Sequence, residues 1–356
     1  MDKKHYAYID VIRVLSMLSI IILHSASYGL RDYYFSKTWH ILNIITSLCT
    51  CAVPLFFMIS GAMVLSSNKT DNLGYLFKNR LPRLVFPLIF WSIACIARDF
   101  YYIHKNLNTF DLSQLYEELI SIISGPVAVH LWFMYALIPL YIVAPFLRKI
   151  IASKKLIKYL LALWIIACSL KTYYVVMPES FKMYFNFDLF NKLNYIDGFL
   201  GYFVVGCFIH ENHLSLKLKG ALPLILIMTA LIAAGTCYAT LKSGEYSEIF
   251  KSYTSIFVIS LSTLLYLLAA SVKRLPETIG KIINYLSSVS MGVYMSGNFF
   301  LGIMRQEGMT FNTARGFVLC TVYTLALCII FTGILKQIKP LCFISTGNKY
   351  KNPFKK

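Results

Sequence analysis

The 356-residue sequence is poor in charged side chains and lacks the short motifs that mark many soluble enzymes. Only 14% of its residues are Asp, Glu, Lys or Arg, whereas soluble domains carry about 25%. It contains no P-loop, no GxSxG, no HExxH and no glycine-rich dinucleotide fingerprint. With 58% hydrophobic and 15% aromatic residues, the composition is typical of a protein embedded in a lipid bilayer.

The sequence has nine cysteines, but none of them forms a CxxC pair and nearly all lie inside apolar runs. Disulfide frameworks and zinc sites require clustered thiols in polar loops. We therefore expect buried thiols that pack as small hydrophobic side chains. We expect no metal site.

Apolar stretches of about 20 residues are long enough to cross a bilayer as helices. Ten segments are candidates: 8–28, 41–65, 84–103, 131–147, 156–176, 195–210, 220–240, 254–271, 282–303 and 316–336. The predicted fold is an all-α integral membrane protein with a bundle of about ten transmembrane helices. Charged residues interrupt the first stretch, which a cleavable signal peptide would not tolerate, so this segment is expected to be retained.

The formal net charge of +18 follows from 34 Lys and Arg against 16 Asp and Glu. In a soluble protein this excess would raise the question of nucleic-acid binding. Here the basic residues concentrate in alternate connections and at both ends of the chain. Cytoplasmic loops collect Lys and Arg, so we predict two cytoplasmic termini, a location in the cell membrane and no nucleic-acid partner. A transmembrane domain over 1–337 would precede a basic tail, 338–356, that is available for anionic lipid headgroups.

Two local patterns predict further structural detail. Residues 109–124 have the periodicity of a short amphipathic helix lying on the outer surface. Pro54 and the step from Ser60 to Gly61 lie inside the second predicted span. These residue types predict a kink and a close approach to another helix.

The first predicted span carries Asp10, Arg13 and His24. Ionisable residues in a span are costly, and they mark a function or a buried partner. Asp10 and Arg13 are spaced to pair on one helix face. His24 lies eleven positions after Arg13. On a helix this offset places His24 within about 20° of the face that carries Arg13, and about 16 Å further along the axis. The alternative is that all three lie in the headgroup layers. A neutral imidazole is nevertheless well suited to proton transfer.

Two other groups of residues stand at predicted span ends. Arg80 and Arg83 share the i,i+3 spacing at the cytoplasmic mouth of the third span. They are suited to grip a phosphate or pyrophosphate, although ordinary positive-inside flanking explains them as well. His130 precedes Trp132 and Tyr135 on the same predicted side as His24. The Trp and Tyr are typical of an interfacial aromatic belt, while the two histidines are placed to share a cavity.

The ninth predicted span is unusually polar. Its polar and small residues are Ser287, Ser288, Ser290, Gly292, Tyr294, Ser296 and Asn298. They imply either a polar cavity or tight packing. Ion pumps place several carboxylates in the middle of the membrane, whereas the candidates here for such a position are Asp10 and Asp197. The local chemistry favours a histidine-centred reaction with a phosphate-bearing donor held by arginines on the cytoplasmic side.

The order of these motifs resembles that of the integral membrane acyltransferase-3 family. Its D-x-x-R-x10-H pattern fits the residues from Asp10 to His24, and its R-x-x-R fits Arg80 and Arg83. Its F-F-x-x-S-G pattern is similar to part of the run 53–65, and its H-x-W-F begins here at His130. The family's ninth helix often reads S-x-G-I-Y-L-x-H-P, but this chain lacks that His and Pro. The departure leaves His24 and His130 as the available histidines.

The resemblance implies transfer of an acyl group, commonly acetyl from cytosolic acetyl-CoA, to a hydroxyl of an extracytoplasmic or lipid-linked glycan. It implies that Arg80, Arg83 and Arg13 hold the CoA phosphates. His24 would act as general base or as acyl carrier, and Asp10 would hold Arg13 in place. The expected substrate and cavity residues are His130, Trp132, Tyr135, Ser60 and Tyr294. The alternative function is a translocator of a polysaccharide or lipid-linked precursor that uses the same cavity without catalysis.

Overall fold

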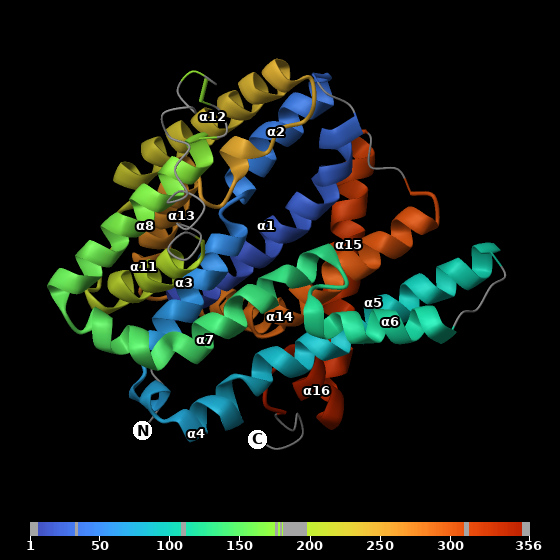
Figure 1. Ribbon diagram of the computed structural model, residues 1–356, viewed down its shortest axis with the longest axis horizontal. Helices are drawn as coiled ribbons and strands as arrows, with labels where there is room; N and C mark the ends of the chain where they lie inside the picture. The colour runs from blue at the N-terminus through green and yellow to red at the C-terminus, as the bar shows by residue number, and fades with distance from the viewer. Residues whose placement is uncertain are drawn as a thin grey trace.

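The computed structural model (Figure 1) describes residues 6–32, 35–107, 112–174, 177–178, 180, 198–309 and 313–350. Asp197 and the end of the chain after Tyr350 lie outside these residues. The structure is 84% helical and the described part has no strand. The all-α prediction is therefore confirmed.

The α-helices of the described residues follow one another along the chain. They are α1 (Ala7–Asp32), α2 (Lys37–Cys49), α3 (Ala52–Leu65), α4 (Leu73–Tyr75), α5 (Pro82–Leu107), α6 (Leu112–Ser124), α7 (Trp132–Ile151), α8 (Lys154–Tyr174), α11 (Leu200–Glu211), α12 (Leu218–Ser243), α13 (Ile256–Ala270), α14 (Glu277–Gln306), α15 (Ala314–Gln337) and α16 (Lys339–Thr346).

Seven stretches of the described chain are long and apolar enough to cross a membrane, by length and composition. They are Ala7–Ser27, Lys37–Leu65, Leu73–Ile103, Leu112–Ile151, Leu218–Ser243, Ile249–Ala270 and Ala314–Gln337. The other three predicted spans correspond to α8, α11 and α14. Helix α11 has 12 residues, fewer than the ~20 that span a bilayer, and α14 is rich in polar residues. The chain is thus a multi-pass protein, and the count of ten stays a prediction.

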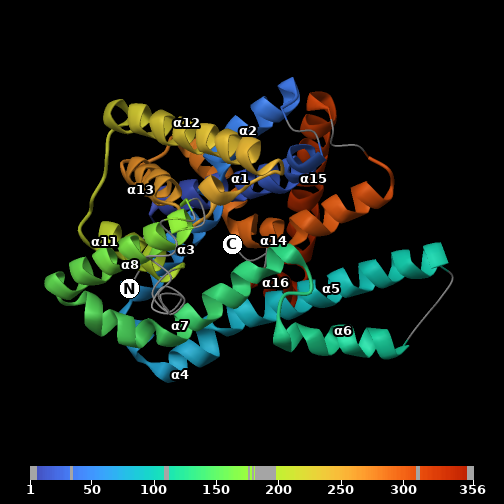
Figure 2. The ribbon, with the colours of Figure 1, turned by 45° about the horizontal axis from the view of Figure 1, so that its top comes forward.

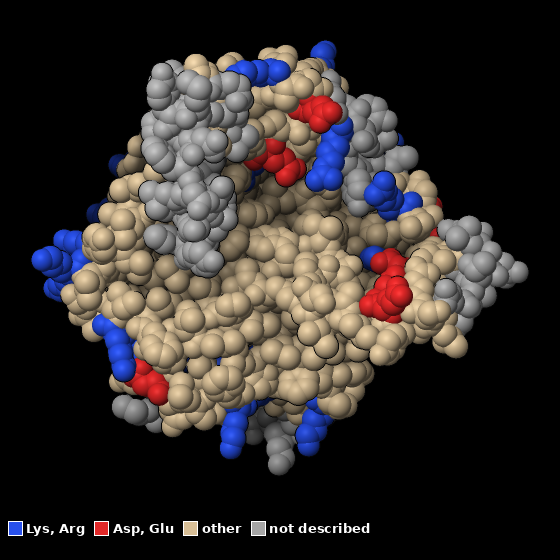
Figure 3. Space-filling view, viewed as in Figure 1, with Lys and Arg blue, Asp and Glu red and all other residues tan. Residues whose placement is uncertain are grey.

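Charged side chains are sparse on the face shown in Figure 3, and they lie mostly toward its rim. Eight of the nine cysteines are buried, as expected, and Cys237 is half-buried. The thiols therefore contribute to packing in the helix bundle.

Helices α1 and α14 pack side by side and run in the same direction. Near their beginnings, Ser287 Oγ donates to Asp10 Oδ1 at 2.5 Å. About ten residues further along both helices, a Cβ added to Gly297 would lie 2.5 Å from Ile21 Cδ1. A common direction is what the first and ninth of ten predicted spans require. The orientation of the bundle in the membrane itself rests on the distribution of basic residues and stays a prediction.

The predicted span 41–65 is made up of α2 and α3, because the helix is interrupted at Thr50 and Cys51. Pro54 stands in the first turn of α3, where its missing N–H leaves no hydrogen bond unmade. The proline therefore marks a helix start rather than a kink within one helix. The helix predicted over 109–124 is present as α6, which lies alongside α5 (Figure 2), and its position on the outer surface stays a prediction.

Helices α3 and α11 approach each other backbone to backbone, as predicted for the segment around Gly61. A Cβ on Gly61 would collide with the carbonyl group of Phe203, and a Cβ on Gly206 would collide with the carbonyl group of Met58. Small residues allow such close helix contacts inside membranes. The two glycines consequently fix the separation of α3, which carries Ser60, from α11.

The segment predicted as a basic tail, 338–356, begins with a helix. Helix α16 packs against α5, α14 and α15, and Cys342 within it is fully buried. The hydropathy pattern gives no hint of this helix because it is only eight residues long and is flanked by lysines.

The Gly61→Ala substitution is expected to lower the thermal stability of the detergent-solubilised protein, because overpacking costs about 1–3 kcal/mol. Gly280→Ala in α14 is the matched control, since the nearest side-chain atom to its added Cβ is 3.8 Å away. Size-exclusion chromatography after heating measures both. Equal melting temperatures for the two variants would contradict the backbone-to-backbone packing.

Candidate active site

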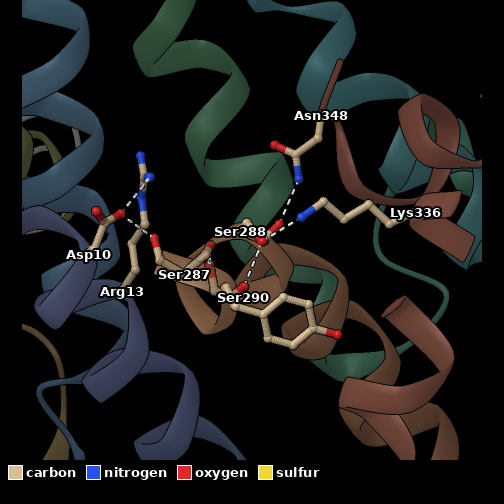
Figure 4. Close-up of polar contacts among 8 residues, drawn as sticks. Asp10, Arg13, Ser287, Ser288, Ser290, Lys336 and Asn348 are labelled. Carbon is tan, nitrogen blue, oxygen red and sulfur yellow. Dashed lines mark hydrogen bonds and ion pairs between the residues drawn. The ribbon is translucent and has the colours of Figure 1, made fainter. Parts of the chain in front are cut away.

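The first helix holds Asp10 and Arg13 together, as predicted. Arg13 Nη1 lies 3.7 Å from Asp10 Oδ1, and the Asp10 side chain is 11% exposed. The same carboxylate oxygen accepts the hydrogen bond from Ser287 on α14 (Figure 4). A buried carboxylate must be paired and hydrogen-bonded to be tolerated. Asp10 therefore ties Arg13 to the seam between α1 and α14, while the Arg13 side chain keeps 38% of its exposure.

A cavity of about 210 Å³ opens beside Arg13. Its polar lining includes Arg13, Ser60, Arg83, Tyr141, Ser287, Ser288, Ser290, Tyr294, Thr346 and Asn348. Its apolar lining includes Phe56, Ile59, Met63, Leu84, Phe133, Leu137 and Met291. The hydroxyl-rich stretch of α14 thus faces a polar cavity. The cavity brings together four residues predicted from the sequence: Arg13, Arg83, Ser60 and Tyr294.

The two arginines before and at the start of α5 have different surroundings. Arg80 Nη1 donates to the Met63 carbonyl at 3.2 Å, and its guanidinium lies 5.9 Å from the centroid of the Tyr75 ring. Arg83 lines the cavity and Arg80 does not, although the buried Nε of each has no hydrogen-bond partner in the described part of the chain. Leaving a buried donor unpaired is costly. The Arg83 guanidinium is therefore suited to an anionic ligand in the cavity.

The two predicted histidines meet. The rings of His24 and His130 are arranged edge to face with centroids 6.4 Å apart. His130 is buried, and its Nε2 lies 2.9 Å from the Met295 carbonyl oxygen. A carbonyl only accepts, so Nε2 carries a proton and donates it to this bond. In the neutral ring, Nδ1 then carries a free lone pair, and it is buried with no hydrogen-bond partner among the described residues. Those residues include no group of three side chains placed to hold a metal ion.

Tyr294 connects the cavity to the histidine pair. It lines the cavity, and its hydroxyl donates to the His130 carbonyl at 2.5 Å. Its ring centroid lies 5.2 Å from that of Phe133 and 5.9 Å from that of Phe56. These three rings, the aromatic partition, stand where the cavity meets the segment that carries His130. The sequence offered a signal for the two phenylalanines, because both belong to the aromatic motifs noted above.

The structure does not bring Trp132 or Tyr135 to this cavity. The Trp132 ring packs against Phe199 and Tyr253, with centroid distances of 5.2 and 5.7 Å. The Tyr135 hydroxyl donates to the Ile122 carbonyl at 2.5 Å and so ties α7 to α6. Both side chains position α7, and their predicted contact with substrate has no support from this geometry.

Sequence reasoning missed the contribution of the C-terminal part of the chain. Asn348 Nδ2 donates to the Ser288 carbonyl at 2.9 Å, and Lys336 Nζ donates to the Ser288 hydroxyl at 2.5 Å. Thr346, Gly347 and Asn348 all line the cavity. No hydropathy or motif signal marks these residues, because their role depends on how α16 folds back.

Asp10→Asn is expected to destabilise the protein by about 1–3 kcal/mol, because it removes a charged hydrogen-bond acceptor from a buried site. Asp71→Asn is the control: this carboxylate is 55% exposed and lies 2.8 Å from Arg148, so its loss should cost at most about 1 kcal/mol. Thermal unfolding in detergent compares the two. A larger effect at Asp71 would contradict the anchoring role given to Asp10.

A family model described as an acyltransferase domain matches residues 6–333. A search of curated proteins and a search of solved structures found no match. The matched region covers nearly the whole chain. It contains α1 with His24, the start of α5 with Arg83, the short segment before α7 with His130, and α14 with Tyr294. The chain therefore belongs to the acyltransferase-3 family and is a multi-pass membrane acyltransferase.

Proposed function

We propose that this acyltransferase moves an acyl group, acetyl in the simplest case, from cytosolic acyl-CoA to a hydroxyl of an extracytoplasmic or lipid-linked glycan. The proposed location is the cell membrane. The observation that carries the proposal is the link that Tyr294 makes between two groups of residues. Tyr294 lines the cavity together with Arg13 and Arg83, and its hydroxyl donates to the carbonyl of His130, whose ring meets that of His24.

The arginines that line the cavity have the chemistry that an acyl-CoA requires. Its phosphates are anions, and Arg-phosphate pairs form strong, bidentate hydrogen bonds. Arg13 is partly exposed and Arg83 has an unpartnered buried Nε, so both have donors to offer. Arg80 also has an unpartnered buried Nε, but it does not line the cavity and its Nη1 is bonded to Met63, so it contributes its charge more than direct hydrogen bonds. The predicted cytoplasmic position of the arginines agrees with a cytosolic donor.

The size of the cavity supports a short acyl group. Pockets that enclose drug-sized ligands measure about 300–1,000 Å³, whereas this cavity measures about 210 Å³. It therefore suits the acyl end of a donor whose larger nucleotide part stays outside. Its apolar lining, including Leu137 and Met291, ends at the aromatic partition.

His24 is the group proposed to act on the acceptor. As a general base, it takes the proton of the acceptor hydroxyl while the acceptor oxygen forms a bond to the acyl carbon. The carbon–sulfur bond breaks, and the thiolate of CoA leaves and takes up a proton. As an acyl carrier, a His24 nitrogen instead bonds the acyl carbon first, while the carbon–sulfur bond breaks and the thiolate of CoA leaves. The acceptor oxygen then bonds the acyl carbon, the nitrogen–carbon bond breaks, and the freed imidazole takes up the hydroxyl proton. His130, oriented by Met295, holds the His24 ring edge-on in either case.

His24→Ala is expected to reduce transfer by about 100–10,000-fold, the usual contribution of a positioned acid or base. His40→Ala is the control, because it removes an imidazole that is exposed and lies away from the cavity. The ring centroid of His40 lies 5.1 Å from that of Trp39. The measurements are CoA release by purified protein and acetyl ester on surface glycans of cells. Full acetyl content with His24→Ala would contradict the proposal. A translocator would instead leave acetylation intact and accumulate precursor inside the cell.

Arg83→Ala is expected to raise KM for acetyl-CoA by about tenfold or more, because a hydrogen bond from a charged donor contributes about 1.5–3 kcal/mol. Arg80→Ala should have a smaller effect, since Arg80 already bonds Met63. Steady-state kinetics at saturating acceptor concentration measure the KM for acetyl-CoA of each variant. A larger KM increase for Arg80→Ala than for Arg83→Ala would contradict this assignment.

A further inference from the structure

Helix α16, the last described helix, contributes to the cavity although it follows the region that the family model matches. The match ends at residue 333, and α16 begins at Lys339. Trp91 Nε1 of α5 donates to the Ser345 carbonyl at 3.0 Å, and both residues are buried. Asn348 bonds to the backbone of α14 through Ser288. The segment from Lys339 to Asn348, the C-terminal wall, is therefore fixed to two helices that also line the cavity.

The turn that ends α16 lies directly against one of the cavity arginines. Gly347 has φ of +66°, a conformation that favours glycine. A Cβ at this position would collide with the Arg83 carbonyl oxygen. The turn therefore sets where the backbone of Arg83 lies, and Asn348, which follows it, lines the same cavity as Arg83. Figure 4 shows Asn348 beside Ser288 and Lys336.

The charges around this wall point to an anionic ligand. Arg13, Arg83 and Lys336 provide three positive charges, and Asp10 provides one negative charge. The buried Nε of Arg83 has no hydrogen-bond partner among the described residues. An anion in the cavity would lie beside both Arg83 and Asn348 of the C-terminal wall, because both residues line it.

We propose that the C-terminal wall completes the acyl-donor site of this chain, and that Asn348 is a binding residue for the anionic part of acyl-CoA. This inference rests on the proposed function. The Asn348 amide is held by Ser288 at one end of the site, and the Gly347 turn positions Arg83. Asn348 and Arg83 together contact a phosphate of the donor. Without the C-terminal wall, only the arginines would hold that phosphate.

The test compares full-length variants purified in detergent. Asn348→Ala and Gly347→Ala are each expected to raise KM for acetyl-CoA roughly tenfold, the effect of losing about one good hydrogen bond, with kcat changed less than about twofold. Asn348→Asp should raise KM further, because it adds a negative charge facing a phosphate. Gly308→Ala is the matched control: Gly308 also has a positive φ, of +79°, but a Cβ there would meet nothing within 4 Å.

Isothermal titration calorimetry of CoA binding distinguishes failure of the C-terminal wall's role from failure of the proposed function. If the wild type binds CoA and both Asn348 variants bind it equally well, the role of the C-terminal wall is overturned while the proposed function stands. If the wild type binds no CoA, the proposed donor fails and the inference falls with it. A purely structural role would lower the melting temperature of Asn348→Ala and leave KM unchanged, which also overturns the inference.

Discussion

The contact between the beginnings of α1 and α14 is the interaction on which the rest of the site depends. Asp10 on one helix accepts the Ser287 hydroxyl of the other and holds Arg13 beside it. Because the two helices run in the same direction, this single anchor also sets the register further along. Gly297 then fits against Ile21, and the part of α14 that carries Tyr294 comes level with the part of α1 that leads to His24.

A polar cavity among membrane helices is stable only if its lining groups are satisfied. The hydroxyls of α14 meet this need locally, since Ser288 donates to the Tyr285 carbonyl at 2.6 Å and Ser290 donates to the Ser287 carbonyl at 2.8 Å. Among the described residues, the unpaired buried side-chain nitrogens are Nε of Arg80, Nε of Arg83 and Nδ1 of His130. A membrane protein bears the cost of such groups where it binds or transforms a ligand. Of these three, Arg83 lines the cavity and His130 meets His24, so the proposed transfer between two substrates gives each of them a role.

Parts of this site were predictable from the spacing of residues within one helix and from the side of the membrane predicted for each span end. The pairing of Asp10 with Arg13 follows from an i,i+3 spacing, and the meeting of His24 with His130 follows from both lying on the same predicted side. The different surroundings of Arg80 and Arg83 were not predictable, because they depend on which carbonyl, here that of Met63, lies within reach. Trp132 and Tyr135 resemble interfacial residues in sequence, yet they contact neighbouring helices. The contribution of Asn348 required knowing that α16 folds back, which no periodicity encodes.

The central claim is that one site joins a donor on one side of the membrane to an acceptor on the other. Reconstituting the protein in sealed vesicles tests it most directly, with acetyl-labelled acetyl-CoA supplied on one side only and a polyhydroxylated acceptor on the other side only. The account predicts labelled ester on the acceptor while free CoA stays on the side where the donor was added. Label that reaches the acceptor only when both substrates share a compartment would contradict it.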